Sequence, residues 1–165
     1  MPKDHLANVT RAIETHATAV LDTSILFDYL LSFYDKNQDP YRKKVLQSML
    51  TLFGKRVITP HVLAELCNLA KKTSNKRDFL DKVTPLLKEF DETHVAKDAI
   101  IENKYFSLLG ATDVAGFLCC NVDKHLDAYL LIKDEEAVGY SKEFNDKIIT
   151  YNDLFAYFWN NFEHK

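Results

Sequence analysis

The stretch Ala19-Val20-Leu21-Asp22-Thr23-Ser24-Ile25-Leu26 passes from an apolar run to a helical pattern through one acid. Its first half is typical of a buried parallel strand, and Thr23 or Ser24 can cap the helix that follows. Asp22 therefore falls at the carboxyl end of a strand, where open α/β sheets bind their ligands. We expect Asp22 to form one wall of a metal site.

The rest of the chain repeats this alternation of short apolar runs with helical periodicity. Strand-like runs occupy residues 56–59, 128–132 and 147–150, and residues 91–95 are either a connector or a fourth short run. Strands separated by helices favour a parallel sheet covered on both faces. The predicted fold is a three-layer α/β/α sandwich around a mainly parallel sheet of four or five strands.

Length and composition indicate a single globular domain. The chain has 165 residues, of which 47% are hydrophobic and 27% charged, so it can bury a substantial core without disulfides. We expect residues 1–17 to form a helical N-terminal extension and residues 18–165 to form one domain that ends in a helix.

The cysteines and the apolar runs indicate the compartment. Cys67, Cys119 and Cys120 lack the number and spacing of a disulfide framework, which favours a reducing environment. No cleavable leader or bilayer-spanning run is visible. The sequence thus predicts a cytoplasmic protein without a membrane partner.

Four acids stand out by position. Asp22 and Asp134 follow strands, Asp113 comes after Thr112 at a predicted helix start, and Glu65 falls in the predicted helical stripe of residues 62, 66 and 69. A carboxylate within an apolar stripe is costly to bury unless it is paired or binds a metal. We expect these acids to meet at one edge of the sheet.

The chemistry of this acid set favours a hard divalent cation. Carboxylates gathered at one edge repel one another, and a cation relieves that repulsion. Oxygen ligands suit Mg²⁺ or Mn²⁺, whereas the six histidines show no zinc-binding spacing.

Four motifs, in this order and at these separations, resemble those of the PIN-domain family. They are Val20-Leu21-Asp22-Thr23-Ser24, Thr59-Pro60-His61-Val62-Leu63-Ala64-Glu65-Leu66, Leu109-Gly110-Ala111-Thr112-Asp113 and Leu130-Leu131-Ile132-Lys133-Asp134. The resemblance spans about residues 18–154. It implies a Mg²⁺- or Mn²⁺-dependent endoribonuclease, a hydrolase of phosphodiester bonds, built on an α/β/α sandwich.

The resemblance also implies roles for individual residues. Asp22, Glu65 and Asp113 match the metal-binding acids of the family, and Asp134 matches its more variable fourth acid; these four are the expected catalytic and metal residues. Thr23 or Ser24 and Thr112 match polar residues that support the site.

The chain departs from the family in two places. Ile132 stands where a hydroxyl residue often precedes the fourth acid, and Glu135 could take the role of Asp134. About eighteen residues precede the first strand, unlike in many VapC-type toxins.

Expected partners follow from the resemblance and from the charge pattern. Net charge is −3, so basic residues must act locally on RNA; the candidates are Lys43, Lys44, Lys71, Lys72, Lys76, Arg77 and Lys133. The resemblance allows an antitoxin partner in a toxin–antitoxin pair. Aromatic residues 155–159 would either complete the core or form a homodimer interface.

Two other functions remain open at this point. One is a PIN-like module that binds RNA or protein without turnover. The other is phosphoryl transfer through Asp22 as a nucleophile, which usually requires a second aspartate two positions on; the chain has Ser24 there.

Overall fold

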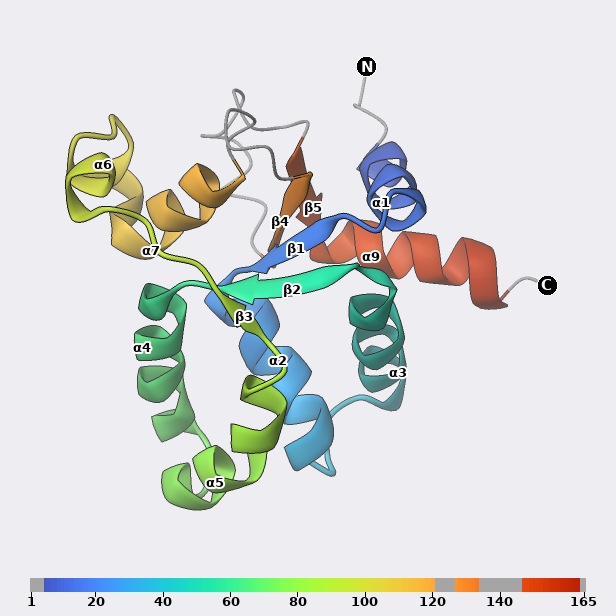
Figure 1. Cartoon of the computed structure of the whole chain (residues 1–165). Coiled ribbons are helices and arrows are strands. Elements are labelled where there is room, and N and C mark those ends of the chain that lie inside the picture. Colours follow the sequence, from blue (N-terminus) through green and yellow to red (C-terminus); the bar gives the residue numbers. More distant parts are fainter. Residues whose placement is uncertain (1–4, 121–126, 134–146, 164–165) are drawn as a thin grey trace.

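The computed structural model describes residues 5–120, 127–133 and 147–163 and contains a five-stranded sheet (Figure 1). The strand order is β3-β2-β1-β4-β5, and every neighbouring pair is parallel. The prediction of an α/β sandwich with a mainly parallel sheet is confirmed. The strands are β1 Thr18–Leu21, β2 Lys55–Ile58, β3 Asp91–Glu92, β4 Ala128–Ile132 and β5 Ile148–Thr150.

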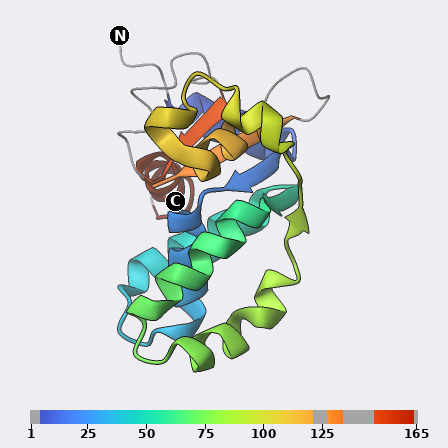
Figure 2. The ribbon, with the colours of Figure 1, turned by 90° about the vertical axis from the view of Figure 1, so that its left-hand side faces the viewer.

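Helices cover both faces of this sheet. Figure 2 shows α6 and α7 on one side and α2, α4 and α5 on the other. Their bounds are α1 His5–Glu14, α2 Thr23–Tyr34, α3 Pro40–Met49, α4 Pro60–Leu69, α5 Lys76–Leu87, α6 Lys97–Ile101, α7 Phe106–Cys119 and α9 Tyr151–Phe158. Short 3₁₀ turns extend α3 over Leu50–Leu52 and α4 over Ala70–Lys72, and a π-helical turn, Trp159–Glu163, follows α9.

The core is split by the alternation of side chains along each strand. Ala19 and Leu21 of β1 face the larger core, which α1, α2, α3, α4, α5 and α9 complete. Val20 faces the smaller core beneath α7 together with Leu130 of β4. Because all five residues of β4 are buried, the strand is an unbroken apolar run, as expected for a strand covered on both faces.

The strand order reverses beside β1. The chain moves from β1 to β2 and β3 on one side, then returns to add β4 and β5 on the other. The Asp22 N–H donates to the Leu131 carbonyl over 3.0 Å, which holds the ends of β1 and β4 together. Such a reversal leaves a crevice at the carboxyl ends of the two strands, and Asp22 lies at this point.

Two predicted helix caps are shifted by one or two residues. The N-cap of α2 is Asp22 itself, whose carboxylate accepts from the Ser24 N–H over 3.4 Å, rather than Thr23 or Ser24. The range of α7 contains two helices that meet at a non-helical Gly110 with φ 82°, so a helix does begin at the predicted turn, and Thr112 lies in its first turn instead of capping it. Both threonines keep their hydroxyls available for another acceptor.

No helix in the described ranges is long and apolar enough to cross a membrane.

Candidate active site

A pocket of about 650 Å³ opens at the carboxyl edge of the sheet and contains three of the four predicted acids. Asp22 comes from the end of β1, Glu65 from α4 and Asp113 from α7, so three separate elements supply them. Among the described residues that line this pocket there is no lysine, arginine or histidine. The described lining of this pocket therefore contains three carboxylates and no basic side chain.

Glu65 is held by two hydroxyl groups. Thr23 Oγ1 donates to Oε2 over 2.8 Å, and Thr112 Oγ1 donates to Oε1 over 2.7 Å. These bonds come from the first turn of α2 and from α7, on either side of α4 in the sequence. A carboxylate that accepts one bond at each oxygen has a fixed plane, and each oxygen still has a lone pair for a further ligand.

The environment of Glu65 decides between two alternatives that the sequence left open. The sequence left open whether this carboxylate is buried in the stripe of α4 or reaches solvent, and the residue is exposed while Val62 and Leu66 are buried. Position 65 lies at the flank of that stripe, since three residues advance a helix by less than one full turn. Glu65 consequently reaches the open pocket instead of the core.

The break at Gly110 shapes the wall that contributes Asp113. Its backbone, at φ 82° and ψ 177°, is not helical, and glycine tolerates this region because it lacks a Cβ. Gly110, Ala111, Thr112 and Asp113 all line the pocket, and Val114 then packs in a separate small cluster with Ile100 and Ala115. The interruption thus places Thr112 and Asp113 at the site.

The donor set of the pocket consists of carboxylate, hydroxyl and amide groups. In residues 5–120, 127–133 and 147–163, no three histidine, cysteine, aspartate or glutamate side chains cluster tightly enough to hold one ion. Mg²⁺ commonly binds through one or two carboxylates and keeps several waters. The all-oxygen donors and the volume of the pocket fit that mode. Asp134 and its alternative Glu135 lie outside the described residues.

Lys133, a predicted RNA contact, is instead engaged by a buried acid. Its Nζ lies 2.9 Å from Oδ2 of Asp28, which is nearly buried on α2. Tyr151, at the start of α9, lies beside this pair with its ring centroid 5.9 Å from Lys133 Nζ. Burial, followed by the charge of Asp28, raises the pKa of Tyr151. The sequence analysis missed Asp28, although an acid between Ile25 and Tyr29 on an apolar helix was a detectable signal.

We expect Lys133→Met to lower the free energy of unfolding by about 2 kcal/mol, because it leaves the Asp28 carboxylate buried without its cation. The loss stays below that of a fully buried pair because the Lys133 side chain is 43% exposed. Chemical denaturation measures it. Lys97→Met removes the exposed pair with Asp98 and should change stability by less than about 0.5 kcal/mol. Equal losses in both variants would contradict this account of Asp28.

The other predicted RNA contacts differ in their surroundings. Lys44 of α3 pairs with Glu163 and its Nζ lies 5.5 Å from the Phe158 ring centroid, so its side chain packs against α9 and the turn that follows it and does not line the pocket. Lys43 is half-buried on α3. The remaining four, Lys71, Lys72, Lys76 and Arg77, are exposed at the end of α4 and the start of α5.

A scan against models of protein families, a search of curated proteins and a search of solved structures found no match to this chain.

The pocket also contains residues that the sequence analysis did not select. Asn68 and Leu69 of α4, and Leu108 and Leu109 of α7, complete its lining. Asn68 lies three positions after Glu65 and so shares its helix face, which was a usable signal. The sequence carried no such signal for the two leucines of α7, because their exposure depends on how α7 packs.

Proposed function

We propose that this chain is a Mg²⁺- or Mn²⁺-dependent endoribonuclease of the PIN type. The observation that carries the proposal is the pocket in which Asp22, Glu65 and Asp113 meet without a basic lining residue among those described. Such a site attracts a cation, and the topological reversal beside β1 is where open α/β sheets bind ligands. The α/β/α sandwich that the PIN resemblance implied agrees with the observed fold.

One or two of the three acids would bind the ion directly, and the others would bind its waters. When bound, a divalent cation supplies Lewis-acid chemistry: it lowers the pKa of water in its shell and offsets charge on a phosphodiester. The chain itself contributes orientation. Thr23 and Thr112 fix the Glu65 carboxylate, and Asp22 is fixed by the Ser24 N–H at the start of α2.

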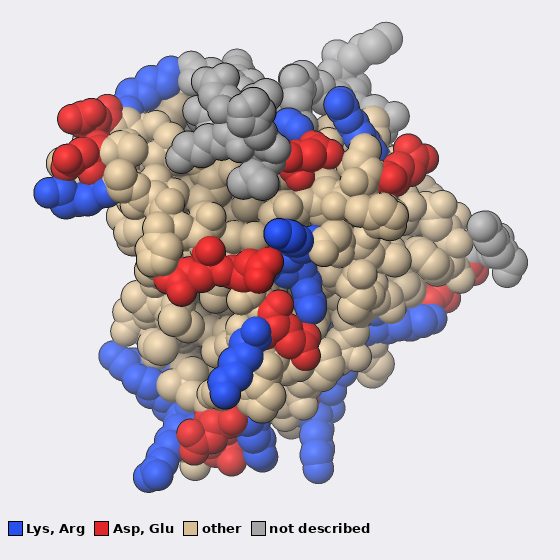
Figure 3. Space-filling view, in the orientation of Figure 1, with Lys and Arg blue, Asp and Glu red and all other residues tan. Residues whose placement is uncertain are grey.

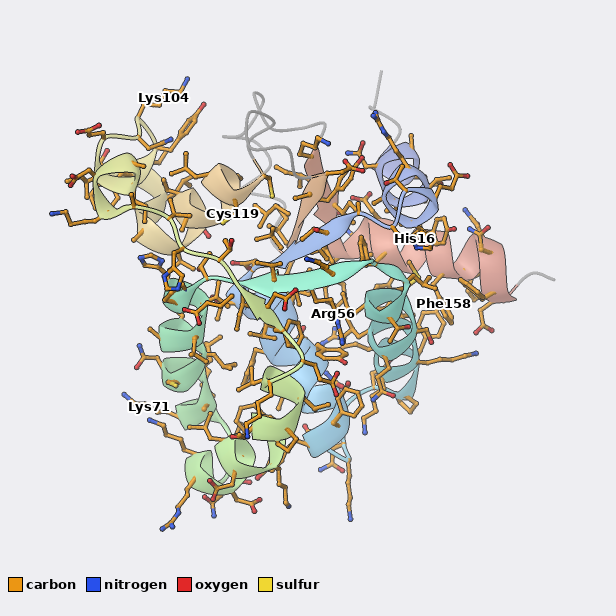
Figure 4. The ribbon with its side chains drawn as sticks, in the orientation of Figure 1. His16, Arg56, Lys71, Lys104, Cys119 and Phe158 are labelled. Carbon is orange, nitrogen blue, oxygen red and sulfur yellow. The ribbon has the colours of Figure 1, made fainter. Side chains whose placement is uncertain are left out.

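A basic surface follows directly on the pocket and supports a polyanionic substrate. Asn68 and Leu69 line the pocket, and the exposed Lys71 and Lys72 come next in the chain. Figure 3 shows Lys and Arg side chains gathered at the lower end of the molecule, and Figure 4 shows Lys71 pointing outward from the end of α4. Glu65 and Lys72 are separated by about 10 Å along the helix axis. An RNA strand that places one phosphate at the acids could therefore reach Lys71 and Lys72 with its neighbouring phosphates.

The proposal is tested by incubating a mixed, end-labelled RNA with the protein and Mn²⁺, Mg²⁺ or EDTA. We expect cleavage with either ion and none with EDTA. Retention of RNA by folded, metal-loaded protein without any cleavage would instead support a non-catalytic binding module. Neither binding nor cleavage would reject RNA as the substrate.

We expect Thr112→Val to lower the cleavage rate by about 10- to 100-fold, because the change removes one of the two bonds that orient Glu65. The threonine contacts no substrate in this account, so the loss should fall on kcat. Thr112→Ser keeps the hydroxyl and should restore most of the rate. Single-turnover cleavage measures both variants, and similar losses in both would show that the hydroxyl is not the cause.

Replacing Lys71 and Lys72 together by alanine should weaken RNA binding and flatten its salt dependence. Each lost phosphate contact to a single strand reduces the slope of log K against log salt by about 0.7. In the described part of the chain neither lysine pairs with an acid. Lys44→Ala is the control, since Lys44 is bound to Glu163. An unchanged slope in the double variant would remove these lysines from the RNA path.

A further inference from the structure

Part of the pocket lining is apolar and has no role in binding a cation. Leu69, Leu108 and Leu109 form an apolar section of the lining, and Leu108 is 58% exposed. One exposed leucine is ordinary on a protein surface. Here it adjoins two further leucines inside the pocket that contains the carboxylates, so a bound group could cover an apolar surface next to the reaction centre.

Asn68 adds a polar group to this apolar section. It is exposed and lines the same pocket one helical turn after Glu65. Within the ranges that the structure describes, its side-chain amide has no hydrogen-bond partner, while other asparagines such as Asn75 and Asn161 bond to the backbone. A primary amide offers donors and an acceptor side by side. Its partner would therefore present an acceptor next to a donor.

Charge restricts what that partner can be. Asp22, Glu65 and Asp113 give the pocket three acids, and an anionic group away from the bound cation would be repelled by them. A neutral, flat group with a hydrogen-bonding edge meets no such penalty. Nucleobases have these properties: apolar side chains contact their faces, and amides read their edges.

We propose that Asn68, Leu69, Leu108 and Leu109 form a nucleobase subsite, and that Asn68 sets the base preference of cleavage. The proposal rests on the ribonuclease function given above and adds to it the determinant of sequence specificity. Along α4 the order is Glu65, Asn68, then Lys71 and Lys72. A single strand would thus place a phosphate at the acids, a splayed base at Asn68 and later phosphates at the lysines. A base stacked within a duplex would not expose its faces to Leu108 and Leu109, so the substrate is unpaired RNA.

The test measures binding of four labelled pentamers of A, C, G or U by fluorescence anisotropy, with Ca²⁺ in place of Mg²⁺. We expect the wild type to bind one pentamer about tenfold more tightly than the weakest. In Asn68→Leu the new side chain has nearly the shape of asparagine, and the affinities for all four pentamers should fall within about twofold of one another. Asn37→Leu, an exposed asparagine outside the pocket, should preserve the preference. Leu108→Ser should weaken all four to a similar degree and keep their order.

Four results would overturn the subsite: equal binding of all pentamers by the wild type, an unchanged preference in Asn68→Leu, loss of preference in Asn37→Leu as well, or no binding of any pentamer. The cleavage assay separates the two proposals. Metal-dependent cleavage without base preference rejects the subsite and leaves the ribonuclease intact. Absence of both cleavage and binding rejects both.

Discussion

Asp22→Asn is expected to lower metal-dependent RNA cleavage by about 10³-fold while the free energy of unfolding changes by less than about 0.5 kcal/mol. The two effects separate because Asp22 has two roles. Its carboxylate is one of three in the pocket, and it also caps α2 by accepting from the Ser24 N–H. Asparagine is as good an N-cap as aspartate but does not supply the negative charge that a hard cation requires.

Asp39→Asn provides a matched control. Asp39 also caps a helix, since its carboxylate accepts from the Arg42 N–H at the start of α3, and it does not line the pocket. Both variants should show wild-type melting, and only Asp22→Asn should lose activity in single-turnover assays with Mn²⁺. A fully active Asp22→Asn protein would remove this residue from the metal site, and the Asp22→Asn/Asp113→Asn double variant would then show whether the pocket takes part at all.

The sequence was informative about the fold because its signals were local. Strands β1, β4 and β5 are short apolar runs, and the acid after β1 marks the point where the strand order reverses. The exposed, acidic β3 carries no such signal, and the sequence left residues 91–95 open as a connector or a strand. The positions of Asp22, Glu65 and Asp113 relative to strand ends and helix starts placed all three at one edge, and one pocket contains them. The position of each acid at the end of its strand or near the start of its helix was thus predictable.

Features that depend on contacts between distant segments could not be predicted from the sequence. Whether Glu65 is buried depends on how α2 and α7 approach α4, and the two threonines that hold it lie far from it in sequence. The pair of Asp28 and Lys133 joins α2 to the end of β4 in the same way. A single sequence contains no information on such pairings beyond residue type, so Lys133 was assigned to RNA.

Gly54 shows the same limit in the fold itself, and Gly54→Ala is expected to destabilise the protein by about 3 kcal/mol, or roughly 10 °C in Tm. A glycine that follows a helical pattern often ends the helix, but α3 ends at Met49 and a 3₁₀ turn lies between it and Gly54. A Cβ at Gly54 would lie 2.1 Å from the backbone oxygen of His16. Figure 4 labels His16 near the connection between α1 and β1.

The clash is costly because this carbonyl cannot move independently. His16 has φ 51°, and the neighbouring Ala17 carbonyl accepts from the Gly54 N–H over 3.0 Å just before β1 begins. Gly116→Ala is the control: its Cβ would meet only the end of the Leu130 side chain, at 3.1 Å, and alanine also favours the helix. We expect that variant to stay within about 1 kcal/mol of the wild type by chemical denaturation. Comparable losses at the two positions would mean that the approach of His16 is not what requires a glycine at position 54.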